Sequence, residues 1–269
     1  MRGAFTITCR RRDDGITAIA TQAVSSPWHL SKPYWDGQVL LVQAANATAG
    51  VFAGDELTLD VTVARDASVL LTSPSAHRIY TMPQGEASQH QCIRVEAGAW
   101  LEWMPELFIP QRDCRYRQKT VIDLADTAGL YFVETMAPGR VGGGEQFAFR
   151  RLDWDTRIRR RERLVWSERF TLEPDGDSLR DLTRNDAAWY VGNALLVRHD
   201  IEAHFRTWQH EVNEWSRADV LAGATRLDDH VYLFRVMACG SELLREHLRR
   251  LRDMLAGSIA PLRQSARKL

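Results

Sequence analysis

Glutamates are the residues of this chain most able to do acid–base chemistry. Four of them, Glu102, Glu106, Glu134 and Glu145, lie within or beside the sequence blocks LEWMPE (101–106) and PGRVGGGE (138–145). Two neighbouring carboxylates could serve as general acid and base, as in glycosidases. The sequence has no nucleophile elbow, no His-Glu-x-x-His zinc motif and no recognisable cofactor loop. We therefore expect ion pairing, or the lining of a hydrated channel that attracts a dication without a fixed site.

Three residues suit a divalent metal such as nickel, which accepts imidazole and thiolate ligands. They are His77, His90 and Cys92. The spacing of His90 and Cys92 would place both side chains on one face of a strand, where they could chelate an ion. Two ligands make only a weak site, so a surface or core role is the expected one.

Two loops and one arginine run have more ordinary interpretations. Asp55 follows Gly54, and we expect a turn there, with a place beside a metal route as the alternative. Residues 139–145 (GRVGGGE) lack the Gly-Lys-Ser/Thr ending of a phosphate loop, so Arg140 is expected to pair with a carboxylate. Residues 157–163 hold five arginines, which we expect on an exposed strand face or a partner surface.

The composition narrows the function further. The 269 residues include 35 basic and 35 acidic side chains, and this balance argues against nucleic-acid binding, which needs a basic surplus. The sequence shows no secretion signal and no apolar run long enough to span a membrane. The four cysteines form no Cys-x-x-Cys pair and are expected to be reduced, which favours a cytoplasmic protein.

A weak internal repeat must position these side chains. Residues 59–71, 92–103 and 120–132 each hold a β-rich run, a polar turn and a second apolar run. The alanines at the turns, Ala67, Ala99 and Ala128, are 32 and 29 residues apart. Such recurrence indicates one supersecondary unit stacked on itself, although chance similarity among strand-turn-strand pieces is an alternative.

Further strands are expected on both sides of the repeat. Residues 5–20 indicate a hairpin, and residues 39–42 indicate a strand buried on both faces. Residues 146–169 alternate cleanly between apolar and charged side chains, which predicts one buried and one exposed face. Leu164 and Trp166 are expected to continue the buried side after a bend.

The pattern becomes helical near residue 200. One predicted helix has a single apolar stripe formed by Ile201, Phe205, Trp208, Val212 and Trp215. A second helix, capped by Ser241 and ended by Gly257, has its own stripe of Leu244, Leu248, Leu251 and Leu255. The predicted fold is mainly β, with a stacked-strand domain at 1–185 and a smaller α+β part at 186–269, or one continuous domain.

Several blocks, taken in order, resemble one known family. Residues 53–60 read AGDELTLD, residues 70–80 read LLTSPSAHRIY, residues 101–106 read LEWMPE, and residues 121–124 read VIDL. They are followed by Glu134 and by residues 138–145, PGRVGGGE. The succession resembles the UreD (UreH) family of urease accessory proteins over about residues 5–260.

This resemblance implies an irregular β-helix and a maturation factor that is not an enzyme. It implies binding to UreF, to the GTPase UreG through UreF, and to apo-urease, with nickel in transit and no tightly bound cofactor. The matched polar residues, expected to line a tunnel or support it, are Asp55, Tyr80, Glu102, Glu106, Glu134, Arg140 and Glu145. The leucine stripe of the second helix is expected to pack in the core, with a place partly in the UreF interface as the alternative.

Two alternatives remain at this point. A carbohydrate-active enzyme on a β-helix would need an open cleft with paired acids and aromatic stacking residues. An unrelated β-rich interaction module would need neither these groups nor any connection with urease.

Overall fold

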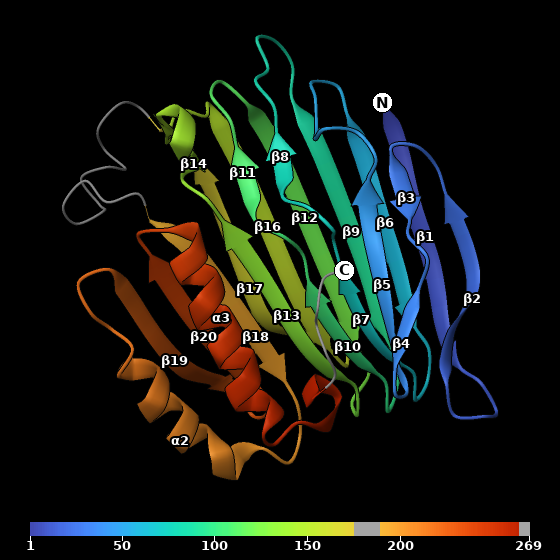
Figure 1. Cartoon of the computed structure of the whole chain (residues 1–269). Helices are drawn as coiled ribbons and strands as arrows, with labels where there is room; N and C mark the ends of the chain where they lie inside the picture. The colour runs from blue at the N-terminus through green and yellow to red at the C-terminus, as the bar shows by residue number, and fades with distance from the viewer. Residues whose placement is uncertain (175–188, 264–269) are drawn as a thin grey trace.

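A computed structural model describes residues 1–174 and 189–263 of the chain. Within these ranges the protein is mainly β, and most strands belong to a seven-stranded and an eleven-stranded sheet. The sheets face each other, and two helices cover the outer side of the larger sheet near its C-terminal strands (Figure 1). No helix in these ranges is long and apolar enough to cross a membrane.

The predicted repeat forms three stacked coils. Each coil places its first strand in the smaller sheet and its second in the larger sheet, and equivalent strands of successive coils pair in parallel. The coils are β6 (Glu56–Val63) with β7 (Ser68–Thr72), β9 (Ala87–Val95) with β10 (Trp100–Met104), and β12 (Arg115–Leu124) with β13 (Gly129–Met136). The expected β-helix-like architecture is confirmed.

The corners of the coils explain the recurring alanines. Ala67, Ala99 and Ala128 are buried, and each donates its N–H to the carbonyl three residues earlier, at 3.0, 3.1 and 3.1 Å. The next coil then bonds to the corner, as Trp100 N–H does to the Ala67 carbonyl at 2.8 Å. A larger side chain would meet the neighbouring coil, which accounts for a small residue at this position.

Hairpins end the smaller sheet on both sides. β1 (Arg2–Arg11) and β2 (Thr17–Val24) form the predicted opening hairpin, and β1 pairs in parallel with β6. At the other edge, β16 (Arg151–Arg160) pairs in parallel with β12 and antiparallel with β17 (Arg163–Leu172).

The prediction that Leu164 lies on the buried side is wrong. Leu164 is 52% exposed, whereas Trp166 is buried as expected. The turn places Arg161 and Glu162 at positive φ, and the pairing register then shifts, so that Leu164 faces Arg159 while Trp166 faces Ile158. Such a bulge reverses the side of the sheet to which a residue points.

The larger sheet also contains strands that do not belong to the three coils. Its remaining members are β3 (Trp28–Leu30), β4 (Tyr34–Asp36), β5 (Val39–Asn46), β8 (His77–Ile79), β11 (Phe108–Pro110), β18 (Tyr190–Val197), β19 (Val220–Asp228) and β20 (Val231–Ala238). Strand β5 is buried at residues 39–42 on both faces, as predicted. A small ribbon, β14 (Gly139–Arg140) with β15 (Glu145–Gln146), encloses the short 3-10 helix Val141–Gly143.

The C-terminal part continues the larger sheet, because β18 pairs antiparallel with β13. The predicted domain boundary at 185/186 lies outside the described residues. Helix α2 (Glu202–Asn213) packs on β19, and α3 (Ser241–Ala256) packs on β18 and β20 before the 3-10 helix Ala260–Arg263. The apolar stripe predicted for α2 is buried from Ile201 to Trp215.

Helix α3 differs from its prediction at its first turn, and its leucine stripe takes the core position rather than the alternative one at an interface. Ser241 is the first helical residue rather than the cap; Gly240 precedes it, and in the described structure no side chain caps this turn. The leucine stripe lies inside the protein: Leu244, Leu251 and Leu255 are buried, and Leu244 and Leu248 pack closely over Gly192 of β18. The stripe therefore attaches α3 to the sheet instead of forming an exposed surface.

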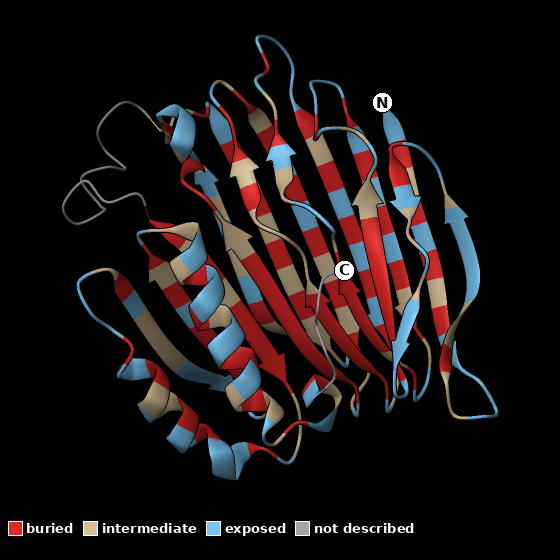
Figure 2. Cartoon of the chain, in the orientation of Figure 1, coloured by how far each residue is buried: buried red, intermediate tan, exposed pale blue. Residues whose placement is uncertain are grey.

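The apolar core lies in two layers. One fills the space between the sheets, and the other separates the larger sheet from the helices. Figure 2 shows the consequence, since strands of the smaller sheet alternate between buried and exposed residues while β13 is buried along most of its length.

Candidate functional site

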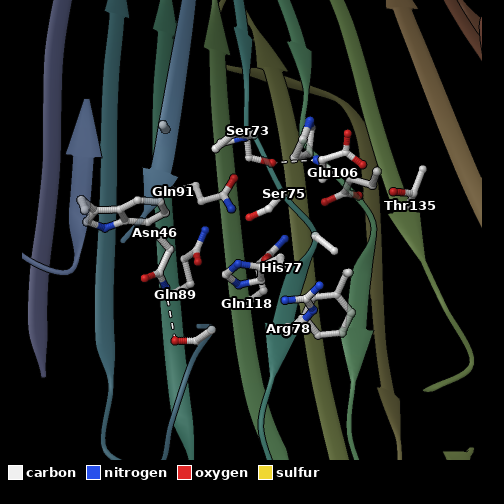
Figure 3. Close-up of a pocket in the computed structure, with 18 of the residues that line it drawn as sticks. Asn46, Ser73, Ser75, His77, Arg78, Gln89, Gln91, Glu106, Gln118 and Thr135 are labelled. Carbon is white, nitrogen blue, oxygen red and sulfur yellow. Dashed lines mark hydrogen bonds between the residues drawn. The ribbon is translucent and has the colours of Figure 1, made fainter. Parts of the chain in front are cut away.

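A polar cavity of about 70 Å³ interrupts the core between the two sheets. One wall is formed by the inward faces of β9 and β12. The opposite wall is formed by β13, the turn at residues 73–76, and β8 (Figure 3). A single water needs roughly 10–15 Å³ of such space, so the cavity has room for a few water molecules.

Inward-facing glutamines make this part of the core polar. Gln89 and Gln91 of β9 and Gln118 of β12 are buried, and each takes a position where an apolar side chain would otherwise complete the core. Further along the same strands the inward positions become apolar, as at Ile93 and Ile122. The amides therefore interrupt an apolar core that continues on both sides of them, at Ala87 and at Ile93.

Glu134 is the carboxyl group of this cavity with the clearest polar partners. Its Oε1 accepts hydrogen bonds from Trp154 Nε1 at 3.1 Å and from Thr156 Oγ1 at 3.0 Å. Burial raises the pKa of Glu134 to about 8, although both hydrogen bonds oppose this shift. At neutral pH the group is therefore mostly protonated, and it can release its proton when a cation enters.

His77 and Tyr116 form a second polar group at the cavity. His77 Nε2 lies 3.2 Å from Tyr116 Oη, and this hydroxyl lies 3.3 Å from Gln89 Oε1 and 3.4 Å from Gln118 Oε1. In Figure 3 the side chains of Gln89 and Gln118 lie beside the His77 ring. Burial lowers the pKa of His77 to about 4, so its imidazole is neutral at pH 7 and able to donate to a metal.

Together these groups can interact with a hydrated cation through oxygen and imidazole donors. A tight metal site needs several ligands at fixed positions. Within residues 1–174 and 189–263, no three His, Cys, Asp or Glu side chains form a group that could hold a metal ion. The arrangement suits loose, water-mediated contact rather than permanent coordination.

Glu106 also lines the cavity. Its backbone N–H donates to Ser73 Oγ at 2.8 Å, which ties the segment after β10 to the turn after β7. Glu106 and Glu134 are thus the two members of the predicted polar set that the structure brings to the cavity, and His77 is the one weak metal candidate found there.

Asp55 and Tyr80 have structural positions. The Asp55 carboxylate is buried, accepts the Phe52 N–H at 2.9 Å and contacts the amino group of Met1. Tyr80 stacks on Phe52 with ring centroids 4.8 Å apart. Both residues stabilise the turn that begins the first coil.

Glu102 holds helix α3 to the sheet. Its carboxylate is 1% exposed and accepts Arg252 Nε at 2.6 Å and Nη2 at 3.0 Å. The two residues are 150 positions apart in the chain, so the ion pair connects the repeat to the C-terminal helix.

Arg140 and Glu145 close the small ribbon, with Arg140 Nη2 donating to Glu145 Oε1 at 2.6 Å. Glu145 also accepts the Arg112 N–H at 3.3 Å. The predicted pairing of Arg140 with a carboxylate is confirmed, and this pair does not line the cavity.

His90 and Cys92 lie on the outer face of β9, away from the cavity. Both are exposed, and Cys92 Sγ lies 3.6 Å from His90 Nε2. The expectation that this spacing puts both side chains on one face is confirmed.

Sequence reasoning missed the three glutamines, Tyr116 and Thr156. The signal was present, because these residues fall on the inward positions of β9, β12 and β16, in phase with the apolar residues of each strand. Polar residues on the buried phase of an alternating strand are uncommon and mark a hydrated interior.

Comparison with known proteins gives a consistent result. The family described as UreD urease accessory protein matches residues 1–268. A urease accessory protein UreD of Opitutus terrae is 39% identical over 260 residues, covering 95% of this chain and 94% of its own length. The UreD of Halalkalibacterium halodurans is 30% identical and covers 77% of this chain and 78% of its own length.

A more distant relative, the UreD of Lachnoclostridium phytofermentans, is 24% identical over 73% of this chain and 72% of its own length. All three are described as accessory proteins, which agrees with the prediction of a role without catalysis. The chain belongs to the UreD family of urease accessory proteins.

Proposed function

We propose that this chain is a cytoplasmic urease maturation factor that passes nickel to the urease active site. In this role it binds apo-urease and a UreF partner, and reaches the GTPase UreG through UreF. Nickel is cargo here, not a resident cofactor. Family membership supports the urease-related role, and the polar cavity is the observation that supports passage of a metal.

The cavity suits such cargo in both chemistry and strength. Nickel accepts imidazole and oxygen donors, which His77, Glu134 and the three amides supply. The protonated Glu134 adds no charge of its own to a cavity that Arg78 and Glu106 also line, and loss of its proton provides a further negative charge when a dication arrives. Weak contact allows release, whereas a closed set of ligands would retain the ion.

The test is a reconstitution of apo-urease with nickel, bicarbonate, GTP, UreF and UreG, with and without this chain. Urease activity that depends on the chain supports the maturation role. Equal activity in both reactions, together with failure to co-purify with UreF, contradicts it.

Replacement of Glu134 by leucine tests the cavity itself. The variant Glu134→Leu should lower urease activation several-fold while retaining UreF binding, because an apolar side chain removes the ionisable group. Glu145→Leu is the matched control, since Glu145 is similarly buried but lies outside the cavity. Equal loss of activation in both variants, or loss of UreF binding in Glu134→Leu, contradicts a role of the cavity in metal passage.

A further inference from the structure

The outer face of the smaller sheet carries a cluster of metal-binding side chain types that the cavity does not use. His90 and Cys92 project from β9, and Asp60 projects from the neighbouring strand β6. The parallel register pairs Asp60 with Cys92, so both side chains lie on the same face of neighbouring strands, where the Asp60 carboxylate acts on the thiol as a nearby negative charge. All three are exposed, so an ion in solution could reach them without any opening of the fold.

The separation of the two stronger donors matches that of a chelating pair. Metal–sulfur and metal–nitrogen bonds of about 2.3 and 2.0–2.1 Å, at a tetrahedral angle, place sulfur and nitrogen roughly 3.5 Å apart. Cys92 Sγ and His90 Nε2 are 3.6 Å apart. Strand geometry places both side chains on one face, because residues i and i+2 point the same way, and their rotamers bring the two donor atoms to this distance.

Charges of both signs surround the His90–Cys92 pair, and negative charges outnumber positive ones among the groups that act on Cys92. Asp60 and Asp123 act on Cys92 as negative charges and Lys119 as a positive one. Lys119 lies opposite His90 in the β9–β12 register, so it is the group that opposes a cation most directly. Since no preformed set of three ligands exists in the described ranges, the site would offer two firm donors and leave the other positions to water or to Asp60.

We propose that His90 and Cys92 chelate a borderline-soft divalent cation, such as Zn²⁺ or Ni²⁺, on the outer face of the smaller sheet. Asp60 supports the bound ion from the adjacent strand. The site lies on the opposite side of the sheet from the cavity, and the proposal does not depend on the function proposed for that cavity.

A cobalt titration of the full, reduced chain tests this site. Co²⁺ bound to a thiolate gives a sulfur-to-metal charge-transfer absorption in the near ultraviolet, and Zn²⁺ should displace it. We expect saturation at one equivalent in the unmodified protein and loss of the absorption in Cys92→Ser and in His90→Gln. Cys239→Ser is the matched control, because Cys239 is the other exposed cysteine of the described chain and should not affect the band.

The neighbouring charges give graded outcomes. Asp60→Asn should raise the half-saturating Co²⁺ concentration about tenfold, as expected for a supporting group. Lys119→Gln should lower it, and Glu134→Leu should leave it unchanged. Absence of the absorption in the unmodified protein, or its persistence in Cys92→Ser, would overturn the proposal.

Discussion

At the scale of single residues, Glu134 shows how burial sets the state of an acid. Two hydrogen bonds from Trp154 and Thr156 stabilise its ionised form and lower its pKa. Burial raises the pKa by more than these bonds lower it, so the carboxyl group remains protonated. The carboxyl therefore behaves as a neutral polar group in the resting protein. Its protonation should therefore affect how the free energy of unfolding depends on pH.

Glu134→Gln should change how stability depends on pH. The pKa of Glu134 rises from 4.5 to about 8 on folding, so between these values only the unfolded chain is ionised. The free energy of unfolding then falls as pH rises, by at most about 1.4 kcal/mol per pH unit. Glutamine stays neutral, so this contribution disappears.

Urea denaturation at pH 5 and pH 8 measures the effect. The advantage of the unmodified protein over Glu134→Gln should be larger at pH 5 than at pH 8. A difference that is the same at both pH values would show that Glu134 does not take up a proton on folding.

The sequence identified Glu134 as a candidate only through the family resemblance. Its two donors could not be predicted, because they come from β16, which reaches the cavity from the other sheet. The glutamines could have been found by their phase in the strands. Asp55, Glu102 and Glu145 look equivalent to Glu134 in sequence, but their partners, which sequence spacing does not reveal, assign them to structural positions.

At the scale of elements, α3 depends on one buried ion pair as well as on its leucines. Arg252 enters the layer between helix and sheet, where it meets Glu102 of β10. Removing one partner of such a pair leaves a buried charge without compensation, whereas replacing both can be neutral.

Arg252→Met should therefore destabilise the protein by about 3–5 kcal/mol, and the double variant Glu102→Leu/Arg252→Met should recover most of the loss. Urea unfolding of the two single variants and the double variant gives the coupling energy. Glu242→Ala is the control on the same helix, because its pair with Arg245 is exposed and should contribute little. If the free energy of unfolding falls no further in Arg252→Met than in this control, the prediction is contradicted.

Elements with a clear period were predictable from the sequence. The repeat, the buried strand β5, the opening hairpin and the stripe of α2 all follow from the spacing of apolar residues. Leu164 was not predictable, because the tight turn at Arg161 and Glu162 adds a residue to one strand only. The leucine stripe of α3 was located correctly, but amphipathicity alone does not distinguish internal packing from a partner surface.

At the scale of the whole molecule, the central strands of the larger sheet join the parts of the chain. Strand β13 belongs to the third coil, pairs with β18 of the C-terminal part, and contributes to both core layers. The sequence suggested either two domains or one, since pairing between β13 and β18 leaves no local pattern. This shared strand favours coupled unfolding.

We expect the chain to unfold in one cooperative transition, because neither core layer is complete without β13. In a urea titration, the unfolding transition measured by far-ultraviolet circular dichroism, which follows helix loss, should coincide with the transition measured by tryptophan fluorescence. The tryptophans report on both layers, with Trp154 between the sheets and Trp208 on the buried face of α2. An earlier transition in the helical signal would mean that the C-terminal part unfolds independently.

The corner hydrogen bonds have a consequence for how such proteins change in length. Each coil presents the same backbone pattern on its upper and lower surface, so an added coil would find its bonding partners already in place. Insertion or deletion of one whole coil preserves the register of all the others, whereas a shorter change would interrupt the ladder. Growth of this architecture is therefore quantised, in steps close to the 29 and 32 residues that separate its corner alanines.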